Sequence, residues 1–246
     1  MYLRLAEDRG FARMHDGGIE SFHSFSFGHY WDKNHMGYSA LRVINDDVFK
    51  PQQGFDTHEH SDMEILTYVT KGALTHEDTL GHKEVIQAGH VQLMRAGTGI
   101  AHSEFNASKT DSVKLLQIWI KPNKKGLKPA YGTMMVPPHE GLKLIANNQP
   151  NAQQQGHLYI AQDAQIFIGH ESRDAEIVYN IAKGRQIYMH LIRGELCLNE
   201  AHWLDEEVYL AAGDGLGLKS EHDKLHIHAL KGVEYILFDL PEDVSL

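Results

Sequence analysis

The stretch GFDTHEHSDMEILTYVTKG, residues 54–72, joins a histidine pair to a strand-forming run. The run EILTYV is rich in β-branched and aromatic residues, which prefer strands, and the turn signal TKG ends it. His58 and His60 stand just before the run and are two residues apart, so in an extended chain they face the same side. The stretch therefore predicts a strand that presents two imidazoles together.

A second pair with the same spacing follows in GTGIAHSEFN, residues 97–106, where His102 and Glu104 also share a face. A single His-x-His pair is a weak signal, but two such pairs separated by a strand and its turns are far rarer. If both strands face the inside of one barrel, three imidazoles and a carboxylate converge. This mixture of nitrogen and oxygen ligands suits a first-row divalent metal and leaves positions for water or substrate. With no thiolate nearby, a closed structural zinc site is disfavoured.

Short strand-like runs separated by turn signals recur along the chain. SALRVIN precedes Asp46-Asp47, and EDTLGHKEVI predicts a hairpin around Leu80-Gly81-His82. Many short strands at close spacing indicate an all-β protein built as an antiparallel sandwich or barrel.

Two halves of the chain are similar. YVTKGALT around Gly72 matches HLIRGELC around Gly194, and AGHVQLMRAG matches AGDGLGLKSE at nearly the same separation. Between the halves lies a polar segment rich in proline, glycine, asparagine and glutamine, with KLIA as a short strand. The sequence predicts an N-terminal barrel over residues 1–122, a linker over 123–155 and a C-terminal barrel over 156–246.

The second half keeps only part of the histidine pattern. The spacing of the repeat places His226 and His228 where the first half has His102 and Glu104. Asn180 and Ala182 stand where the facing histidine pair would be, and His170 or His190 could supplement the site. We therefore expect a degenerate C-terminal barrel without metal.

Composition excludes several classes of partner. The chain has 246 residues, 23 Lys and Arg against 33 Asp and Glu, and a formal net charge of −10, so no broad basic surface can bind nucleic acid directly. No apolar run approaches the roughly 20 residues that span a bilayer, and the N-terminus lacks a signal-peptide core. The single cysteine, Cys197, has apolar neighbours and is expected to be buried. One cysteine excludes an internal disulfide and indicates a cytoplasmic protein.

Histidine is unusually frequent, with 18 residues. Those with polar or turn-like neighbours, such as His76 and His82, are expected to be surface or loop residues.

The first half resembles the pirin family of the cupin superfamily. The resemblance is carried, in order, by HSFSFGHYWD, MGYSALRVINDD, FDTHEHSDMEILTYVTKG, AGHVQLMRAGTGIAHSE and LLQIWI, and it extends more weakly through the second half. It implies a bicupin fold of two antiparallel, jelly-roll-like β-barrels in tandem. It also implies one divalent metal in the N-terminal barrel, with ligands His58, His60, His102 and Glu104. Fe(II) is the expected ion, with Ni, Mn, Cu, Co and Zn as alternatives.

Glu64 is a rival to Glu104 as the carboxylate ligand. Cupin motifs in general place a glutamate a few residues after the second histidine, and Glu64 stands near that position. The resemblance to pirins lies at His102-x-Glu104 and favours Glu104, which leaves Glu64 in a supporting role.

Some bacterial pirins resemble quercetin 2,3-dioxygenases, so the resemblance implies a metal-dependent enzyme that cleaves flavonols with dioxygen. Glu104 is then the catalytic base as well as a ligand. The alternative is a non-enzymatic, redox-sensing metal protein that regulates through protein partners, as animal pirins do. An aromatic-lined pocket leading to the metal would favour the enzyme, and an acidic patch flanking the metal would favour the regulator.

Overall fold

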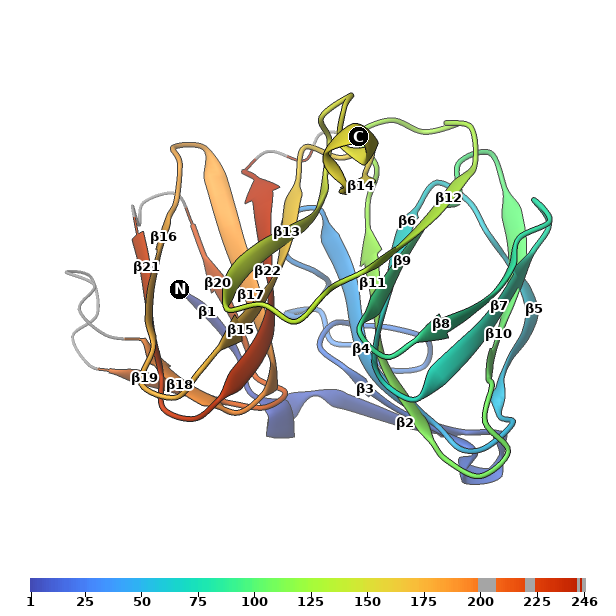
Figure 1. Cartoon of the computed structure of the whole chain (residues 1–246), viewed down its shortest axis with the longest axis horizontal. Coiled ribbons are helices and arrows are strands. Elements are labelled where there is room, and N and C mark those ends of the chain that lie inside the picture. Colours follow the sequence, from blue (N-terminus) through green and yellow to red (C-terminus); the bar gives the residue numbers. More distant parts are fainter. Residues whose placement is uncertain (199–206, 220–223, 243, 245–246) are drawn as a thin grey trace. The chain divides into compact units, whose positions relative to one another are not determined.

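The computed structural model describes residues 1–198, 207–219, 224–242 and 244. Strands make up almost all of the regular structure (Figure 1), which confirms the predicted all-β class. Residue contacts divide the chain into two compact units, which we describe separately. The N-terminal unit comprises Gly10–Pro137 and Leu158–Gln162; the C-terminal unit comprises Met1–Arg9, Pro138–His157 and the described residues from Asp163 on.

The N-terminal unit consists of two antiparallel sheets. One has the strand order β12-β9-β6-β11-β4-β3-β2 and the other the order β5-β10-β7-β8. The strands of these sheets are β2 (Gly10–Met14), β3 (Ile19–His23), β4 (Leu41–Phe49), β5 (Gly54–His60), β6 (Glu64–Lys71), β7 (Ala73–Asp78), β8 (Lys83–Gln87), β9 (His90–Arg95), β10 (Ile100–Asn106), β11 (Val113–Ile120) and β12 (Ala130–Met135). The short β14 (Leu158–Tyr159) is grouped with this unit by its contacts but belongs to neither sheet.

The C-terminal unit repeats this arrangement. Its larger sheet contains the order β1-β20-β17-β22-β15-β13, and its smaller sheet is β16-β21-β18-β19. The strands are β1 (Tyr2–Arg4), β13 (Gly141–Asn147), β15 (Gln165–Glu171), β16 (Glu176–Asn180), β17 (Arg185–Arg193), β18 (Glu195–Leu198), β19 (Val208–Ala211), β20 (Gly215–Leu218), β21 (Lys224–Ala229) and β22 (Val233–Pro241). Three short 3-10 helices complete the described chain: η1 (Ala6–Asp8), η2 (His15–Gly17) and η3 (Gln153–Gln155).

The two matched glycines occupy equivalent turns. Gly72 joins β6 to β7 with φ +78°, and Gly194 joins β17 to β18 with φ +90°. Only glycine adopts such a conformation without strain, which explains why both halves carry it at this position.

The expected boundaries and the contact grouping differ at the N-terminus and in the middle of the chain. Residues 1–9 group with the C-terminal unit because β1 pairs with β20, with Tyr2 opposite Gly217. The segment 123–155, expected as a linker, contains β12, which pairs with β9, and β13, which pairs with β15. Its KLIA run lies in β13, as predicted.

The prediction of a turn at Asp46-Asp47 is wrong. Strand β4 continues through both residues to Phe49, and β3 and β11 pair with it over this length. Asp47 faces inward and is 1% exposed, and the Ser21 hydroxyl on β3 donates a hydrogen bond to its Oδ1. An acidic residue that normally marks a turn thus stands inside a strand because its side chain finds a partner in the barrel.

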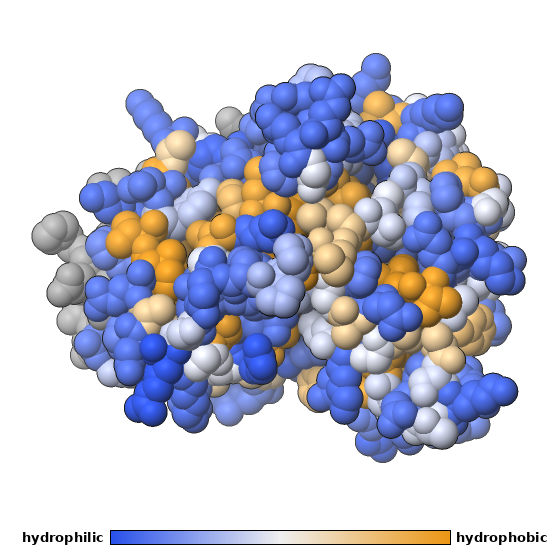
Figure 2. Space-filling model, in the orientation of Figure 1, coloured by the Kyte–Doolittle hydropathy of each residue, from blue (hydrophilic) through white to orange (hydrophobic). Residues whose placement is uncertain are grey.

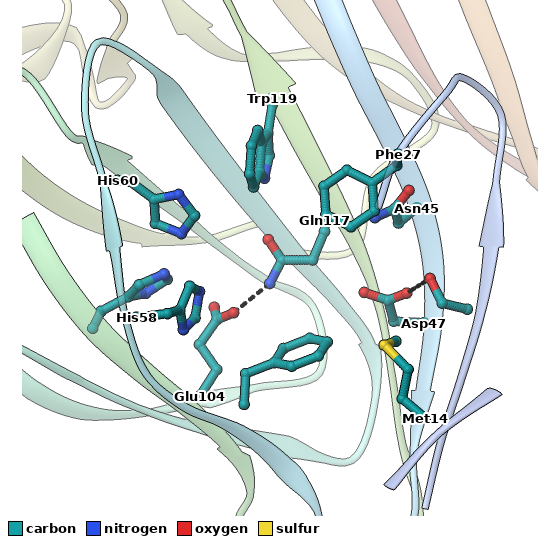
Figure 3. Close-up of a pocket in the computed structure, with 12 residues that line it drawn as sticks. Met14, Phe27, Asn45, Asp47, His58, His60, Glu104, Gln117 and Trp119 are labelled. Atoms are coloured by element: carbon teal, nitrogen blue, oxygen red, sulfur yellow. Dashed lines mark hydrogen bonds between the residues drawn. The ribbon is translucent and has the colours of Figure 1, made fainter. Parts of the chain in front are cut away.

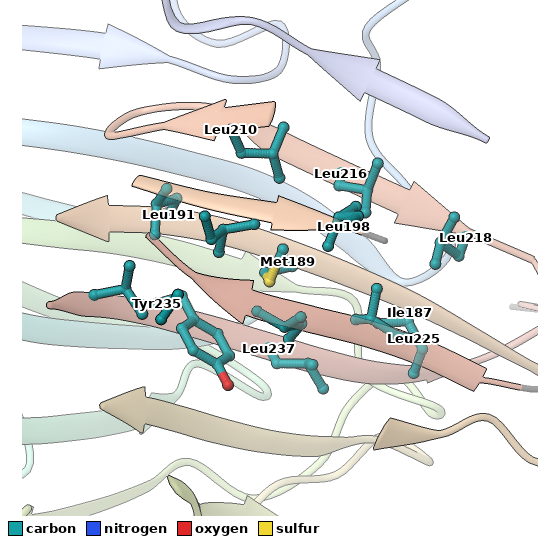
Figure 4. Close-up of a cluster of buried hydrophobic side chains, with 14 of the residues drawn as sticks. Ile187, Met189, Leu191, Leu198, Leu210, Leu216, Leu218, Leu225, Tyr235 and Leu237 are labelled. Carbon is teal, nitrogen blue, oxygen red and sulfur yellow. The ribbon is translucent and has the colours of Figure 1, made fainter. Parts of the chain in front are cut away.

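The interiors of the two units differ. In the N-terminal unit the buried hydrophobic residues form two smaller clusters, one of Ile19, Phe49, Val69, Leu74, Ile86, Val113 and Leu115 and the other of Ile65, Met94, Ala96 and Ile100. In the C-terminal unit a larger cluster, drawn in Figure 4, gathers inward side chains from both sheets, among them Met189, Leu198, Leu216 and Leu237. One interior therefore keeps space for polar side chains, and the other is packed with aliphatic ones.

Among the described residues, no helix is long and apolar enough to span a membrane. The face of the molecule in Figure 2 is mostly hydrophilic, with hydrophobic residues in separate patches.

Candidate metal centre

Strands β5 and β10 bring the two predicted pairs together. They pair antiparallel, with His58 directly opposite His102 and His60 opposite Ile100. Gly54 makes this approach feasible at the other end of β5, because a Cβ there would lie 2.0 Å from the carbonyl oxygen of Glu104. A register shift between His102 and Glu104 then places Glu104 opposite Phe55.

Three imidazoles form the centre of the site. The ring centroids of His58 and His102 are 4.5 Å apart, those of His58 and His60 4.8 Å, and those of His60 and His102 4.9 Å. Each ring offers one nitrogen, and the three nitrogens lie within 4.8 Å of one another. This geometry suits three nitrogen ligands around one divalent ion.

Neighbouring groups orient two of the rings. His58 Nδ1 donates to the carbonyl oxygen of Asp56 at 2.8 Å, which fixes the tautomer and leaves Nε2 to bind a metal. The ring of His60 packs edge-on against Trp119, with centroids 4.9 Å apart.

His102 is the strongest test of whether a metal fits. The residue is 2% exposed, and both of its ring nitrogens are buried without a hydrogen-bond partner in the described structure. Buried polar atoms normally have a hydrogen-bond partner, so the unpaired ring nitrogens of His102 are consistent with binding a metal ion. Burial and the neighbouring imidazoles lower the pKa of His102 to about 2, and burial with His58 lowers that of His60 to about 4. Both rings are therefore neutral at pH 7, the form that binds metal.

Glu104 faces the same interior and is 1% exposed. Its Oε2 accepts a hydrogen bond from Gln117 Nε2 at 2.5 Å, and its Oε1 lies 3.5 Å from the Thr67 hydroxyl that donates to it. Burial raises the pKa of Glu104 to about 7, although both hydrogen bonds oppose the shift. The carboxyl group can consequently take up and release a proton near neutral pH.

His76 is buried, contrary to the prediction of a surface residue. It is 0% exposed and lies opposite Glu104 on β7. Its ring forms a second cluster of candidate ligands with His102 and Glu104. Both nitrogens of His76 already have partners, with Nε2 3.1 Å from Asp78 Oδ2 and Nδ1 accepting from Gln92 at 3.2 Å. Since His58 keeps a nitrogen free, the cluster of His58, His60 and His102 is the better centre.

Glu64 is engaged elsewhere. It begins β6, and its Oε1 accepts from Arg95 Nε at 2.7 Å in a buried ion pair. Neither cluster of candidate ligands in the described chain includes it.

A pocket of about 180 Å³ adjoins the centre (Figure 3). Much of its wall is aromatic or aliphatic, and the centroids of Phe27 and Trp119 lie 5.3 Å apart, edge to face. The pocket is lined by Met14, Ser21, Phe27, Asn45, Asp47, Phe55, His58, His60, His102, Glu104, Gln117 and Trp119.

Sequence reasoning missed the polar residues of the larger sheet. Gln117 lies in the apolar run LLQIWI, and Asn45 and Asp47 lie at alternate positions of β4. A lone polar residue within an apolar strand was the available signal, because such a side chain must be satisfied when it is buried.

Asp47 should make the folded protein less stable as the pH rises. Burial, opposed by the Ser21 hydrogen bond, raises its pKa from 3.8 to about 8. Between pH 3.8 and about 8 the unfolded chain loses the proton of this carboxyl group and the folded chain keeps it. The free energy of unfolding is therefore unaffected by this group below pH 3.8 and decreases as the pH rises toward 8. Near pH 8 we expect the free energy of unfolding of Asp47→Asn to exceed that of wild type by at least about 1.4 kcal/mol, the equivalent of one pKa unit, so the variant should unfold at a higher temperature.

Thermal unfolding at about pH 4, 6 and 8 with equal metal content measures this effect. Asp46→Asn, the next residue on β4, is the matched control and should show a much smaller change. A pH-independent difference for Asp47→Asn would contradict the assigned pKa.

The histidine pair of the C-terminal unit does not face the barrel interior. On β21 the buried residues are Leu225, Ile227 and Ala229, whereas His226 and His228 are half-buried on the opposite face. The proposed equivalence of these histidines with His102 and Glu104 is wrong, because a register difference of one residue reverses which side chains point inward. Cys197 is buried, as predicted.

We therefore expect His226→Ala combined with His228→Ala to leave metal content unchanged. Both candidate ligand clusters found among the described residues lie in the N-terminal unit, and the described interior of the C-terminal unit is packed mainly with aliphatic side chains. Metal analysis of the purified double variant tests this, and a fall in metal per chain to about half would show that the second unit also binds an ion.

Two antiparallel β-barrels in one chain, one of them with a histidine centre beside an aromatic pocket, define a bicupin metalloprotein. Comparison with family profiles is more specific: the Pirin profile matches residues 5–120, and the profile described as Quercetinase C-terminal cupin domain matches residues 148–240. The chain belongs to the pirin family.

Relatives from bacteria match nearly the whole chain. The quercetin 2,3-dioxygenase of Escherichia coli (strain K12) is 42% identical over 241 residues, 98% of this chain and 99% of that protein. The crystal structure of the bacterial pirin YhhW from Escherichia coli in complex with nickel(II) is 40% identical, with a TM-score of 0.89 and coverage of 98% and 99%. Bacillus subtilis oxalate decarboxylase, at 10% identity, 100% and 78% coverage and a TM-score of 0.67, shares the fold alone.

Proposed function

We propose that this protein is a dioxygenase that cleaves flavonols such as quercetin, with one divalent metal held by His58, His60, His102 and Glu104. Fe(II) is the proposed ion. The observation that carries the proposal is the convergence of three imidazoles and a buried carboxyl group on an aromatic-lined pocket. The name of the Escherichia coli relative, quercetin 2,3-dioxygenase, supports the substrate class.

Glu104 is suited to move the proton that the reaction releases. A bound metal supplies a Lewis acid that lowers the pKa of the flavonol 3-hydroxyl. Glu104 is buried beside the pocket and can accept that proton at Oε1, since Gln117 already occupies Oε2. The flavonolate then combines with dioxygen, both oxygen atoms enter the products, the ring opens to an ester, and one ring carbon leaves as carbon monoxide.

The apolar walls position the substrate and exclude water. Phe27, Phe55 and Trp119 offer aromatic surface for a flat, multi-ring molecule. Trp119 also contacts the ring of His60, so the same side chain supports both the ligand and the substrate wall.

The pocket favours the enzyme over the alternative of a non-enzymatic regulator. A regulator that acts through its surface has no need for an aromatic cavity beside the metal centre. We also infer from the single, buried cysteine that the protein works in a reducing compartment such as the cytoplasm.

Aerobic turnover of a flavonol panel tests the proposal directly. Protein loaded separately with Fe(II), Ni, Mn, Cu, Co or Zn is incubated with each flavonol while oxygen uptake and carbon monoxide release are recorded. We expect equal amounts of both gases per flavonol consumed, with the fastest turnover for Fe(II). Two results together would contradict the enzyme and support the regulator: no carbon monoxide is released with any metal, and a protein partner binds only when the metal is oxidised.

A further inference from the structure

The pocket has a second polar end that the proposed chemistry does not use. In Figure 3, His58, His60 and Glu104 lie on one side, and Asn45 and Asp47 lie on the other. The second group belongs to β4 of the larger sheet, whereas the candidate ligands belong to β5 and β10 of the smaller sheet. A molecule bound at the metal centre would therefore extend toward a separate set of polar atoms.

Asp47 is the chemically unusual member of this set. The residue is 1% exposed, and the charged groups of the described structure that act on its carboxyl group, Asp46 and Glu104, are both acidic. One oxygen, Oδ1, accepts a hydrogen bond from the Ser21 hydroxyl, and Figure 3 shows the other oxygen directed into the pocket. A buried carboxyl group with an oxygen left to the cavity is costly unless a bound molecule completes its hydrogen bonds.

Asn45, the other polar residue of β4 at this end of the pocket, has no unpaired side-chain oxygen. Asn45 Oδ1 already accepts from His23 Nδ1 at 2.8 Å, so its oxygen is occupied within the protein. Asp47 thus has the better hydrogen-bonding atom for a ligand at this end of the pocket.

We propose that Asp47 is the specificity-determining residue of the site, and that its cavity-facing oxygen hydrogen-bonds a hydroxyl group on the part of the aromatic substrate remote from the metal centre. This inference rests on the proposed function and names its preferred substrates: flavonols with additional hydroxyl groups. A carboxylate accepts from such a hydroxyl and a carboxylic acid donates to it, so either form recognises the group. Burial raises the pKa of Asp47 to about 8, which favours the donating form at neutral pH.

The expected discrimination is large. A site built to hydrogen-bond a substrate hydroxyl rejects an analogue that lacks it, because the buried protein group is then left unpaired. We expect wild type to prefer the hydroxylated substrate by about 10- to 100-fold. Since Asp47 does not belong to the candidate metal centre, its replacement should change selectivity rather than metal content.

Two flavonols provide the test. Quercetin carries several hydroxyl groups, whereas 3-hydroxyflavone keeps only the 3-hydroxyl and the adjacent carbonyl. Dissociation constants are measured by anaerobic titration of the metal-loaded full chain, which prevents turnover, and kcat/KM is measured aerobically. The variants are Asp47→Leu, similar in size but apolar, and Asp47→Asn, which keeps hydrogen-bonding groups. Asp46→Asn on the opposite face of β4 is the matched control.

We expect the preference for quercetin to fall by about 10- to 100-fold in Asp47→Leu, to be largely retained in Asp47→Asn, and to equal that of wild type in Asp46→Asn. Equal binding of both flavonols by wild type would overturn the inference even if Asp47→Leu failed to fold, and so would an unchanged preference in Asp47→Leu. Selective anaerobic binding of quercetin without turnover would contradict the dioxygenase function and support the role of Asp47. Turnover of both flavonols without selectivity would support the dioxygenase function and contradict the role of Asp47.

Discussion

Glu104→Gln is expected to keep most of its bound metal and to lose about 10²–10⁴-fold in flavonol turnover, the usual effect of removing a general base. The amide retains the shape of the side chain and one oxygen that can meet the metal or accept from Gln117. It cannot accept the 3-hydroxyl proton, and the three imidazoles still hold the ion. Turnover divided by metal content, measured on the same sample, separates the two effects.

Two other glutamates serve as matched controls. Glu59 lies between His58 and His60 on β5 but is exposed, so Glu59→Gln should change neither metal content nor turnover per metal. Glu64→Gln removes the carboxylate from the buried ion pair with Arg95 and should lower the unfolding temperature while the metal remains. If Glu64→Gln loses the metal and Glu104→Gln does not, the carboxylate ligand has been assigned to the wrong residue.

His58→Ala and His76→Ala should separate the two overlapping histidine clusters. His58 belongs only to the cluster with His60 and His102, and His76 belongs only to the cluster with Glu104 and His102. Loss of a direct ligand should weaken metal binding by more than the roughly 10- to 100-fold that is typical when a residue hydrogen-bonded to a ligand is removed. We therefore expect His58→Ala to be purified nearly free of metal and inactive, and His76→Ala to retain metal with a lower unfolding temperature.

His102→Ala completes this comparison because His102 is common to both clusters and should lose the metal in either case. Metal content is read by elemental analysis, and affinity by competition with a chelator of known strength. Retention of metal in His58→Ala with loss in His76→Ala would place the ion in the deeper cluster.

The paired histidines illustrate how far sequence alone could lead. The alternation of side chains along a strand correctly predicts that His58 and His60 face one way, and the spacing of two such pairs predicts that they meet. No local pattern shows that β7 lies on the other side of β10, so His76, which has polar neighbours in sequence, was expected at the surface. Asp78 and Gln92 satisfy its buried ring nitrogens, and Gln92 reaches it only because the larger sheet, which contains β9, packs against the smaller one.

The predictions for the two aspartates of β4 and for the histidines of β21 were wrong for different reasons. Asp46-Asp47 is typical of a turn, but β4 pairs with β3 and β11 along this length and the Ser21 hydroxyl on β3 donates a hydrogen bond to the buried carboxyl group of Asp47. For His226 and His228 the repeat was recognised correctly, but few identities support the alignment after Gly213. An error of one residue in such an alignment is invisible in composition and reverses the predicted face completely.

The reversed face of β21 also limits how this protein could be redesigned or could evolve. A second metal centre in the C-terminal barrel could not be made by adding ligands opposite His226 and His228, since these point away from the interior. New ligands would have to replace Leu225 and Ile227, each 1% exposed within the aliphatic cluster. Before any ion bound, each new imidazole would carry buried, unpaired nitrogens that cost ~1–3 kcal/mol. A metal centre in the C-terminal barrel would therefore require several simultaneous substitutions in its hydrophobic core, and each of them would destabilise the fold before an ion bound.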